Sequence, residues 1–211
     1  NKMIINKLAK NSVRSNKKQY GILFFTIVLS AFMLFCVFTI GWTYLDSSRL
    51  QNTRLNGAEY DIVTMNGFTS EQLNTLQQNE NIRSVGIESY AGFIQSTEYD
   101  KTVEIGLLWC DEVFWDNLMS PARTKLDGHY PQNKNELMVT KDILKTCGNE
   151  NLSVGDSLIL TYENNTGVYT DEFVISGIWD GYGDTSAGFV SKAFYDETGY
   201  DLKNNGILCI K

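Results

Sequence analysis

An uncharged, apolar stretch covering residues 19–45 constrains this chain more than any other feature of its sequence. Most of it is the run ILFFTIVLSAFMLFCVFTIGWTYL. A helix rises about 1.5 Å per residue, so about 20 residues cross a hydrocarbon core about 30 Å thick. A single span in lipid must satisfy its own backbone hydrogen bonds, and only a helix does so. We therefore predict one transmembrane helix with an extracytoplasmic extension over residues 19–56, ending near Gly57.

Charges and aromatic residues at the two ends of this stretch predict its orientation. Six cations and no acid precede Tyr20, and a cation-rich flank faces the cytoplasm. Tyr20 is expected at the cytoplasmic interface, and Trp42 and Tyr44 at the outer interface, where aromatic rings are enriched. The rest of the chain is then extracytoplasmic, and the protein is located in the cell membrane. The candidate membrane-interface residues are Lys7, Lys10, Arg14, Lys17, Lys18, Tyr20, Trp42 and Tyr44.

The basic leader, residues 1–18, has apolar residues at the spacing of one helix face. They are Ile4, Ile5, Leu8, Ala9 and Val13. With lysines on the opposite face, the pattern favours an amphipathic helix that lies on the inner leaflet and binds membrane lipids. A positively charged flank without a helix is the alternative. A cleaved signal peptide is disfavoured, because the apolar run is too long and no Ala-x-Ala pattern follows it.

Residues 57–211 read as one extracytoplasmic α+β domain. Strands are expected at 59–65, 82–89, 91–99, 102–109, 136–140, 168–179, 186–190 and 206–211, and a turn followed by a strand is expected at 153–162. Short helices are expected at 68–79, 110–119, 141–147 and 192–199, with Thr69 or Ser70 as the N-cap of the first. Residues 125–136 are rich in turn formers, and NNTG at 164–167 predicts a hairpin. A domain of this size can bury a sizeable core.

The charge and the cysteines of the outer part exclude several classes of protein. From Asp46 onward, the other 12 cations stand against all 25 acids, so this part carries a net charge of −13, which argues against binding nucleic acid. Cys36 lies in the membrane helix, and Cys110, Cys147 and Cys209 lie outside it. Three is an odd number and no CxxC spacing occurs, so the sequence indicates no zinc site and no disulfide framework. A single Cys110–Cys147 bridge stays open as an alternative.

No catalytic, cofactor-binding or metal-binding residue stands out in the sequence. It has no G-x-x-x-x-G-K-[ST], no H-E-x-x-H and no G-x-S-x-G. Its only histidine, His129, lies in a turn context and is expected to be exposed or structural. Residues 180–188 place two acids in a glycine-rich segment without the calcium ladder, which favours a solvated turn. The aromatic residues Trp109, Phe114, Trp115, Trp179 and Tyr182 are expected in the core and at its rim, with a binding groove as the minor alternative.

Two parts of the chain carry a resemblance to a known family. Leu8, Asn11, Arg14 and Lys17 fill the pattern L-x-x-N-x-x-R-x-x-K that leads into the first membrane helix of FtsX-like/MacB-like ABC transporter permeases, which this opening resembles. The second part follows the order of the family's outer domain. Its matching residues are Gly128, Pro131, Asn135, Glu136, Val154, Gly155, Asp156, Phe173 and Gly177. We expect Gly155 and Asp156 to turn the chain into a strand, and Gly177 to let a long strand bend or bulge.

The resemblance implies an outer domain of the MacB-like periplasmic core type and a role without catalysis of its own. Such permeases have three further membrane helices, work as dimers or as two halves of one chain, and pair with a separate ABC ATP-binding subunit in the cytoplasm. ATP-driven closure of that subunit moves the membrane helices and then the outer domains, which expel a substrate or signal. We therefore expect this sequence to be a fragment of a permease subunit, with the substrate and the choice between efflux and signalling left open.

Two other functions compete with the permease. A membrane-anchored extracytoplasmic sensor or ligand-binding module would also need one span and a folded outer domain. An anchored hydrolase is a third class, but no residues in the sequence support it. The presence of an ATPase partner discriminates the first class from the other two.

Overall fold

The computed structural model describes residues 3–5, 7, 11, 15–96, 105–182 and 187–211. The chain divides into two compact units, Asn1–Leu50 and Gln51–Lys211. We describe each unit by itself.

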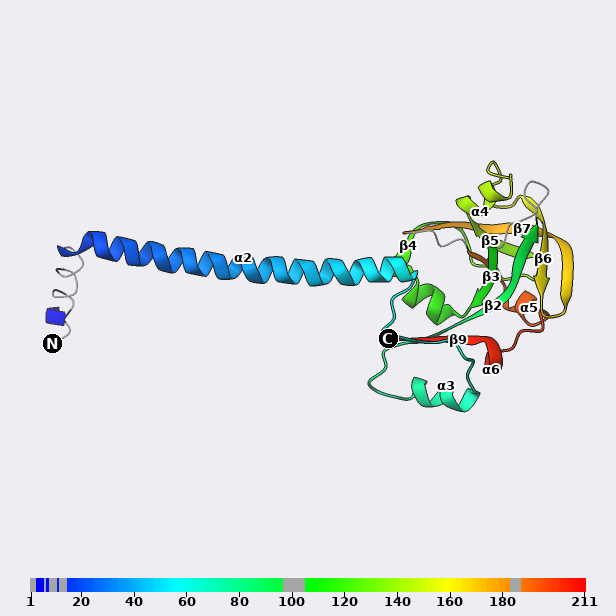
Figure 1. Ribbon diagram of the computed structural model, residues 1–211, viewed down its shortest axis with the longest axis horizontal. Coiled ribbons are helices and arrows are strands. Elements are labelled where there is room, and N and C mark those ends of the chain that lie inside the picture. The colour runs from blue at the N-terminus through cyan, green and yellow to red at the C-terminus, as the bar shows by residue number, and fades with distance from the viewer. Residues whose placement is uncertain (1–2, 6, 8–10, 12–14, 97–104, 183–186) are drawn as a thin grey trace. The chain divides into compact units, whose positions relative to one another are not determined.

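A single long helix dominates the first unit. It is α2 (Lys17–Asn56), which continues into the first residues of the second unit (Figure 1). No residue of α2 is buried, and the helix is long and apolar enough to cross a membrane. It ends where the sequence indicates, before Gly57. The described leader residues 3–5, 7, 11 and 15 are also helical.

The second unit is built on one mixed sheet, which confirms the expected α+β class. The strands run in the order β1-β9-β2-β3-β8-β5-β7-β4, and β6 pairs with both β2 and β7. The pairings of β2, β3, β8, β5, β7 and β6 therefore form a closed circuit. The strands are β1 (Ile62–Thr64), β2 (Val85–Ser96), β3 (Ile105–Cys110), β4 (Arg123–Gly128), β5 (Glu136–Thr140), β6 (Ser157–Asn164), β7 (Gly167–Gly181), β8 (Ala187–Val190) and β9 (Gly206–Ile210).

Short helices connect the strands, and N-cap residues explain where α3, α4 and α5 begin. Thr69 caps α3, because its hydroxyl accepts from the Gln72 amide while the Gln72 side chain accepts from the Thr69 amide. Thr140 and Ser191 likewise cap α4 and α5 through their hydroxyls. The helical elements are α3 (Ser70–Gln77), the π-helix η1 (Val113–Leu118), the 3-10 turn η2 (Ser120–Ala122), α4 (Lys141–Thr146), α5 (Lys192–Tyr195) and α6 (Leu202–Asn205).

The central strands of the sheet are covered by protein on both faces, whereas β6 alternates between buried and exposed residues. The period of two along a strand sends Leu107 and Trp109 to one hydrophobic cluster, and Leu108 and Cys110 to another. The first cluster is the larger one and includes α4 and α5. The second cluster lies between the opposite face and η1, and its buried members are Ala58, Cys110, Phe114, Trp115, Leu118, Met119, Met138, Trp179, Phe189, Ile207 and Cys209.

Three local expectations differ from the structure. The two strands expected at 82–89 and 91–99 form one strand, β2, because the chain bulges between Tyr90 and Gly92 instead of turning. The first part of the turn-rich segment 125–136 lies in β4, because pairing with β7 outweighs its local turn preference. The helix expected at 110–119 is a π-helix, and α6 was not foreseen.

Gly155 and Asp156 make the turn that the family resemblance indicates. Gly155 has φ of +95°, and the Asp156 carboxylate accepts a hydrogen bond of 2.8 Å from the Ser153 amide. Both residues also bond the backbone of Ile175 on β7, at 2.8 and 2.9 Å. The turn is therefore fixed to the middle of the longest strand.

Gly128 and Gly177 lie opposite each other where β4, β5 and β7 meet. Gly128 has φ of +89°, and a Cβ there would lie 2.2 Å from the Ser176 carbonyl oxygen. A Cβ on Gly177 would lie 2.8 Å from Cε of Met138. The register of β5 against β7 shifts at this point, so the bulge expected at Gly177 is confirmed.

We predict that Gly128→Ala destabilises the domain by more than Gly155→Ala. Both glycines have positive φ, which costs about 1 kcal/mol when alanine replaces glycine. No atom lies within 4 Å of a Cβ at Gly155, whereas Gly128 would clash with backbone, so Gly128→Ala should cost about 2 kcal/mol or more. Urea unfolding followed by tryptophan fluorescence measures both losses. Equal losses would contradict the close approach of β4 to β7.

Candidate functional site

A cavity of about 230 Å³ lies against the second cluster of the outer domain. Its walls come from β1, β2, β3, β7, β8, β9 and η1, together with the residues where α2 ends. Most of its surface is apolar, and aromatic rings make up much of the lining. The rings belong to Tyr60, Tyr90, Phe114, Trp179 and Phe189.

One carboxylate, that of Glu88, lines this cavity. Glu88 lies on β2 between two second-cluster residues on the neighbouring strands, Cys110 on β3 and Ile207 on β9. Glu88 is half-buried, and this partial burial raises its pKa from 4.5 to about 7. None of the three ion pairs between described residues includes Glu88. The fold therefore holds an acid that is partly protonated at neutral pH.

The titratable groups that face Glu88 are neutral. The charge of Glu88 contributes to raising the pKa of Tyr60, Cys110, Tyr130 and Cys209, after burial, which is the largest cause for each. For Cys209 the pKa rises to about 12. Thiols and phenols with such values carry no charge at pH 7 and cannot neutralise a carboxylate.

The aromatic wall of the cavity is held by contacts between rings. The centroid of Trp179 lies 5.6 Å from that of Phe189 and 6.5 Å from that of Trp115. The indole Nε1 of Trp179 is buried and has no hydrogen-bond acceptor in the described part of the chain. An unpaired buried N–H costs about 1–3 kcal/mol. The cavity thus has a packed aromatic wall and one acid without an ion pair among the described residues.

The cysteines next to the cavity are structural. Cys110 and Tyr130 are tied together, because the Cys110 amide donates to the Tyr130 hydroxyl at 3.0 Å and that hydroxyl donates to the Cys110 carbonyl at 3.3 Å. Burial raises the pKa of the Cys110 thiol well above its ordinary value, so the thiol is a poor nucleophile. All four cysteines are free, and the Cys110–Cys147 bridge is not formed.

Other residues considered from the sequence do not form a site. His129 is exposed, and its Nδ1 lies 3.0 Å from the Tyr130 carbonyl oxygen. Part of the glycine-rich segment 180–188 lies outside the described residues; of the rest, Tyr182 is partly exposed, with the Arg54 guanidinium 3.8 Å above its ring. Within the described ranges, no three His, Cys, Asp or Glu residues are grouped to hold a metal. The aromatic residues expected in the core are buried there, except for Tyr182 at its rim.

The candidate membrane-interface residues that the structure describes lie mainly on α2. Lys17 and Lys18 open the helix, and Tyr20, Trp42 and Tyr44 are exposed on it. The helical rise places Tyr20 and Trp42 about 33 Å apart, close to the thickness of a hydrocarbon core of about 30 Å. Lys7 lies in the described leader and is exposed, whereas Lys10 and Arg14 lie outside the described residues. Their contact with lipid stays a prediction.

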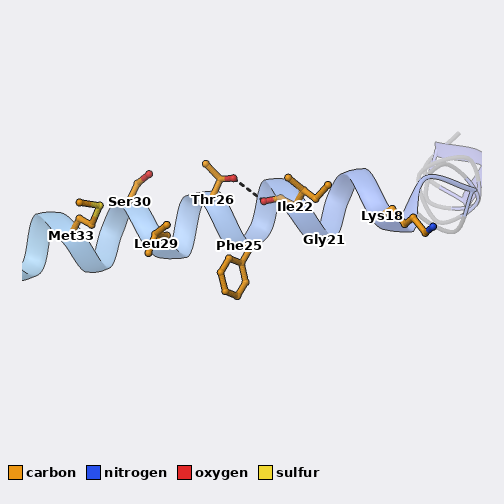
Figure 2. Close-up of a pocket in the computed structure, with 8 residues that line it drawn as sticks. All are labelled: Lys18, Gly21, Ile22, Phe25, Thr26, Leu29, Ser30 and Met33. Atoms are coloured by element: carbon orange, nitrogen blue, oxygen red, sulfur yellow. Dashed lines mark hydrogen bonds between the residues drawn. The ribbon is translucent and has the colours of Figure 1, made fainter.

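A shallow groove follows one side of α2 near its start (Figure 2). Its residues recur at intervals of three and four, so they form one continuous stripe. Thr26 in this stripe donates its hydroxyl to the Ile22 carbonyl at 2.9 Å, and Thr39 does the same to Phe35 at 2.8 Å. These hydroxyls are satisfied inside the helix, as a lipid environment requires. The stripe consists of Lys18, Gly21, Ile22, Phe25, Thr26, Leu29, Ser30 and Met33.

No protein-family model matches the chain, and no curated protein matches it in sequence. Three solved structures are similar to it. The extracellular domain of the noncanonic ABC-type transporter YknZ from Gram-positive bacteria has 14% identity and a TM-score of 0.45 over 68% of this chain and 72% of that one. The periplasmic region of MacB from Actinobacillus actinomycetemcomitans has 12% identity and a TM-score of 0.46 over 70% and 72%. A domain described as part of a permease from Porphyromonas gingivalis has 9% identity and a TM-score of 0.42 over 72% and 65%.

We predict that Glu88 makes the outer domain less stable as the pH rises. Its pKa is raised in the folded state, so between about pH 4.5 and 7 the folded state holds more protons than the unfolded state, and stability falls as pH rises through this window. Between pH 5 and 8 the loss should be about 2–3 kcal/mol. Glu88→Gln should remove this part of the pH dependence and be more stable than the wild type at pH 8.

Urea unfolding of the full chain in detergent, followed by tryptophan fluorescence at several pH values, measures this loss. Glu172→Gln is the matched control, because Glu172 is an exposed acid on β7 and its loss should leave the pH dependence unchanged. Parallel curves for the wild type and Glu88→Gln would show that Glu88 titrates as an ordinary surface acid.

Proposed function

We propose that the chain belongs to a permease subunit of a bacterial ABC exporter or mechanotransmission complex. The observation that carries this proposal is the convergence of the residues that resemble the permease pattern. Gly128, Asn135, Gly155, Asp156 and Gly177 lie far apart in the sequence, yet each pairs with or bonds to the segment 174–177 of β7 or lies in it. The pattern thus describes one structural unit, which supports a shared fold and not a chance match of loose motifs.

The same proposal gives the chain a leader at 1–18, a transmembrane helix with its extension at 19–56 and an extracytoplasmic core domain at 57–211. The length and apolar surface of α2 support the span. The cations before Tyr20 support a cytoplasmic N-terminus, and membrane lipids are then direct partners of the leader and of α2.

In this role the chain does no chemistry of its own. A separate ABC ATP-binding subunit hydrolyses ATP in the cytoplasm, and the membrane helices transmit the movement to the outer domain for efflux or signalling. A second permease copy or half completes the membrane part. The stripe on α2 supports such a helix partner, because Gly21 and Ser30 leave room for close approach of a second helix.

One specific observation favours a second candidate function. The cavity beside Glu88 is a feature expected of a membrane-anchored sensor or ligand-binding module, which would need no ATPase. The two functions are separated by the partner that the protein keeps in its own membrane.

The proposal is tested by affinity purification of the natural full-length protein from its own membranes in mild detergent. We expect a nucleotide-binding subunit in stoichiometric amount and ATP hydrolysis by the purified complex. A version that begins at Gln51 serves as the control and should lose the subunit, because it lacks the leader and the membrane-spanning part of α2. Absence of any nucleotide-binding subunit, from membranes whose other complexes stay intact, would favour the anchored module.

The topology gives a separate prediction. A membrane-impermeant maleimide added to whole cells should label Glu172→Cys on the outer domain and should not label Asn16→Cys before α2. Both positions are exposed, so only the membrane distinguishes them, and permeabilised cells should show equal labelling. The natural cysteines of the domain are buried and give a low background. Labelling of Asn16→Cys in intact cells would overturn the proposed orientation.

A further inference from the structure

We propose that the cavity beside Glu88 is a binding site for an alkylammonium group, carried by a small amine or by a basic side chain of a peptide. This inference goes beyond the permease role and does not depend on it, because every wall of the cavity belongs to the unit Gln51–Lys211. A ligand that enters it would also contact Asn56 and Gly57, where α2 ends.

The walls have the composition of a site that attracts cations. Tyr60, Tyr90, Phe114, Trp179 and Phe189 line one small cavity. The negative faces of such rings attract ammonium groups. Contacts among Trp115, Trp179 and Phe189 hold part of this wall before any ligand arrives. A preformed site loses less entropy when it binds.

When it is ionised, the carboxylate of Glu88 gives the cavity a negative charge. No cation of the neighbouring elements forms an ion pair with Glu88 in the described chain. Arg123 on β4 lies 4.1 Å above the ring of Trp115, and Asp116 is the acid that acts most strongly on it. Lys211 forms an ion pair with Glu59, and Arg54 packs on Tyr182.

The remaining titratable groups around Glu88 add no positive charge to the cavity. Tyr60, Cys110, Tyr130 and Cys209 are neutral at pH 7, and Asp111 adds negative charge next to the cysteines. Asp111 itself is held by the amides of Ile87 and Phe114, at 3.0 and 2.8 Å. An ammonium in the cavity would therefore be the first cation to pair with Glu88.

The size of the cavity narrows the class of ligand. A volume of about 230 Å³ equals that of about eight liquid water molecules, so the site takes a small head group and not a whole drug-sized molecule.

Isothermal titration calorimetry on the full chain in lipid nanodiscs tests the proposal with three probes. Choline represents a free small ammonium, and Nα-acetyl-lysine amide represents a basic peptide side chain. The third probe, 3,3-dimethylbutan-1-ol, has the shape of choline without its charge. We expect at least one cation to bind at pH 7.5 and the neutral probe to bind at least tenfold more weakly.

Binding should also displace a proton from Glu88. Because Glu88 is about half protonated near pH 7, each bound cation should release about half a proton there, and less as the pH rises. Titrations in two buffers of different ionisation enthalpy measure this release. Glu88→Gln should lose both the affinity and the proton release, whereas the control Glu172→Gln should keep both. Near-ultraviolet circular dichroism of each variant confirms that the domain remains folded.

Each outcome decides the proposal. Binding of choline alone assigns the site to free amines, and binding of the lysine amide alone assigns it to basic peptides. Failure of both cations to bind, equal binding of the neutral probe, or unchanged binding by folded Glu88→Gln overturns it. None of these results depends on whether an ATPase co-purifies, so this site and the permease role can fail separately.

Discussion

The outer domain depends on the way in which one strand, β7, pairs with three others. β7 is the longest strand, and it is antiparallel to β4 and β6 and parallel to β5. β6 pairs with residues 167–174 of β7 and β4 pairs with residues 177–181, and the register of β5 against β7 shifts between Ile175 and Gly177. The absence of side chains at Gly128 and Gly177 permits the close approach that this shift needs. The turn at Gly155 and Asp156 then bonds to Ile175, so the middle of β7 holds both the sheet and the loop beside it.

The closed circuit of strands determines where polar groups can lie. A sheet with one solvated face would leave every second side chain in water, but here one face packs on the first cluster and the other on the second. Glu88 lies on the face covered by η1 and the end of α2, among Cys110 and Ile207. The same covering that buries the aromatic residues therefore also desolvates the one acid among them, and it leaves a cavity where the packing of rings is incomplete.

Local patterns in the sequence were sufficient for most elements, and tertiary pairing explains the exceptions. The capping box at Thr69, the hairpin at 164–167 and the long strand after it all have strong local causes, and the structure contains each of them. No local sequence pattern predicts β4, because residues 123–128 become a strand only through pairing with β7. The bulge at Gly92 looks like a break in sequence, although the strand continues through it.

The candidate site could not be predicted from the sequence, because tertiary contacts that local patterns do not contain bring its residues together. In the segment 85–90, Val85, Ile87 and Ser89 alternate with Gly86, Glu88 and Tyr90, which is the pattern of a strand with one face in water. Nothing in that segment reveals that η1 covers the second face. Trp179 was expected in the core or at its rim, but its position with Phe189 around the same space as Glu88 depends on strands far apart in the sequence.

The cost of Glu88 is itself an argument for function. A leucine or methionine at this position would bury apolar surface at no electrostatic cost, whereas the carboxylate loses solvation without gaining an ion pair among the described residues. No element of the fold is capped, turned or joined by its side chain in the described structure, in contrast to Asp111, Asp156 and Glu136, whose carboxylates accept backbone hydrogen bonds. A group that weakens the fold and supports none of its elements is best explained by something that it binds. The aromatic rings around it make an ammonium the ligand that offsets this cost most directly.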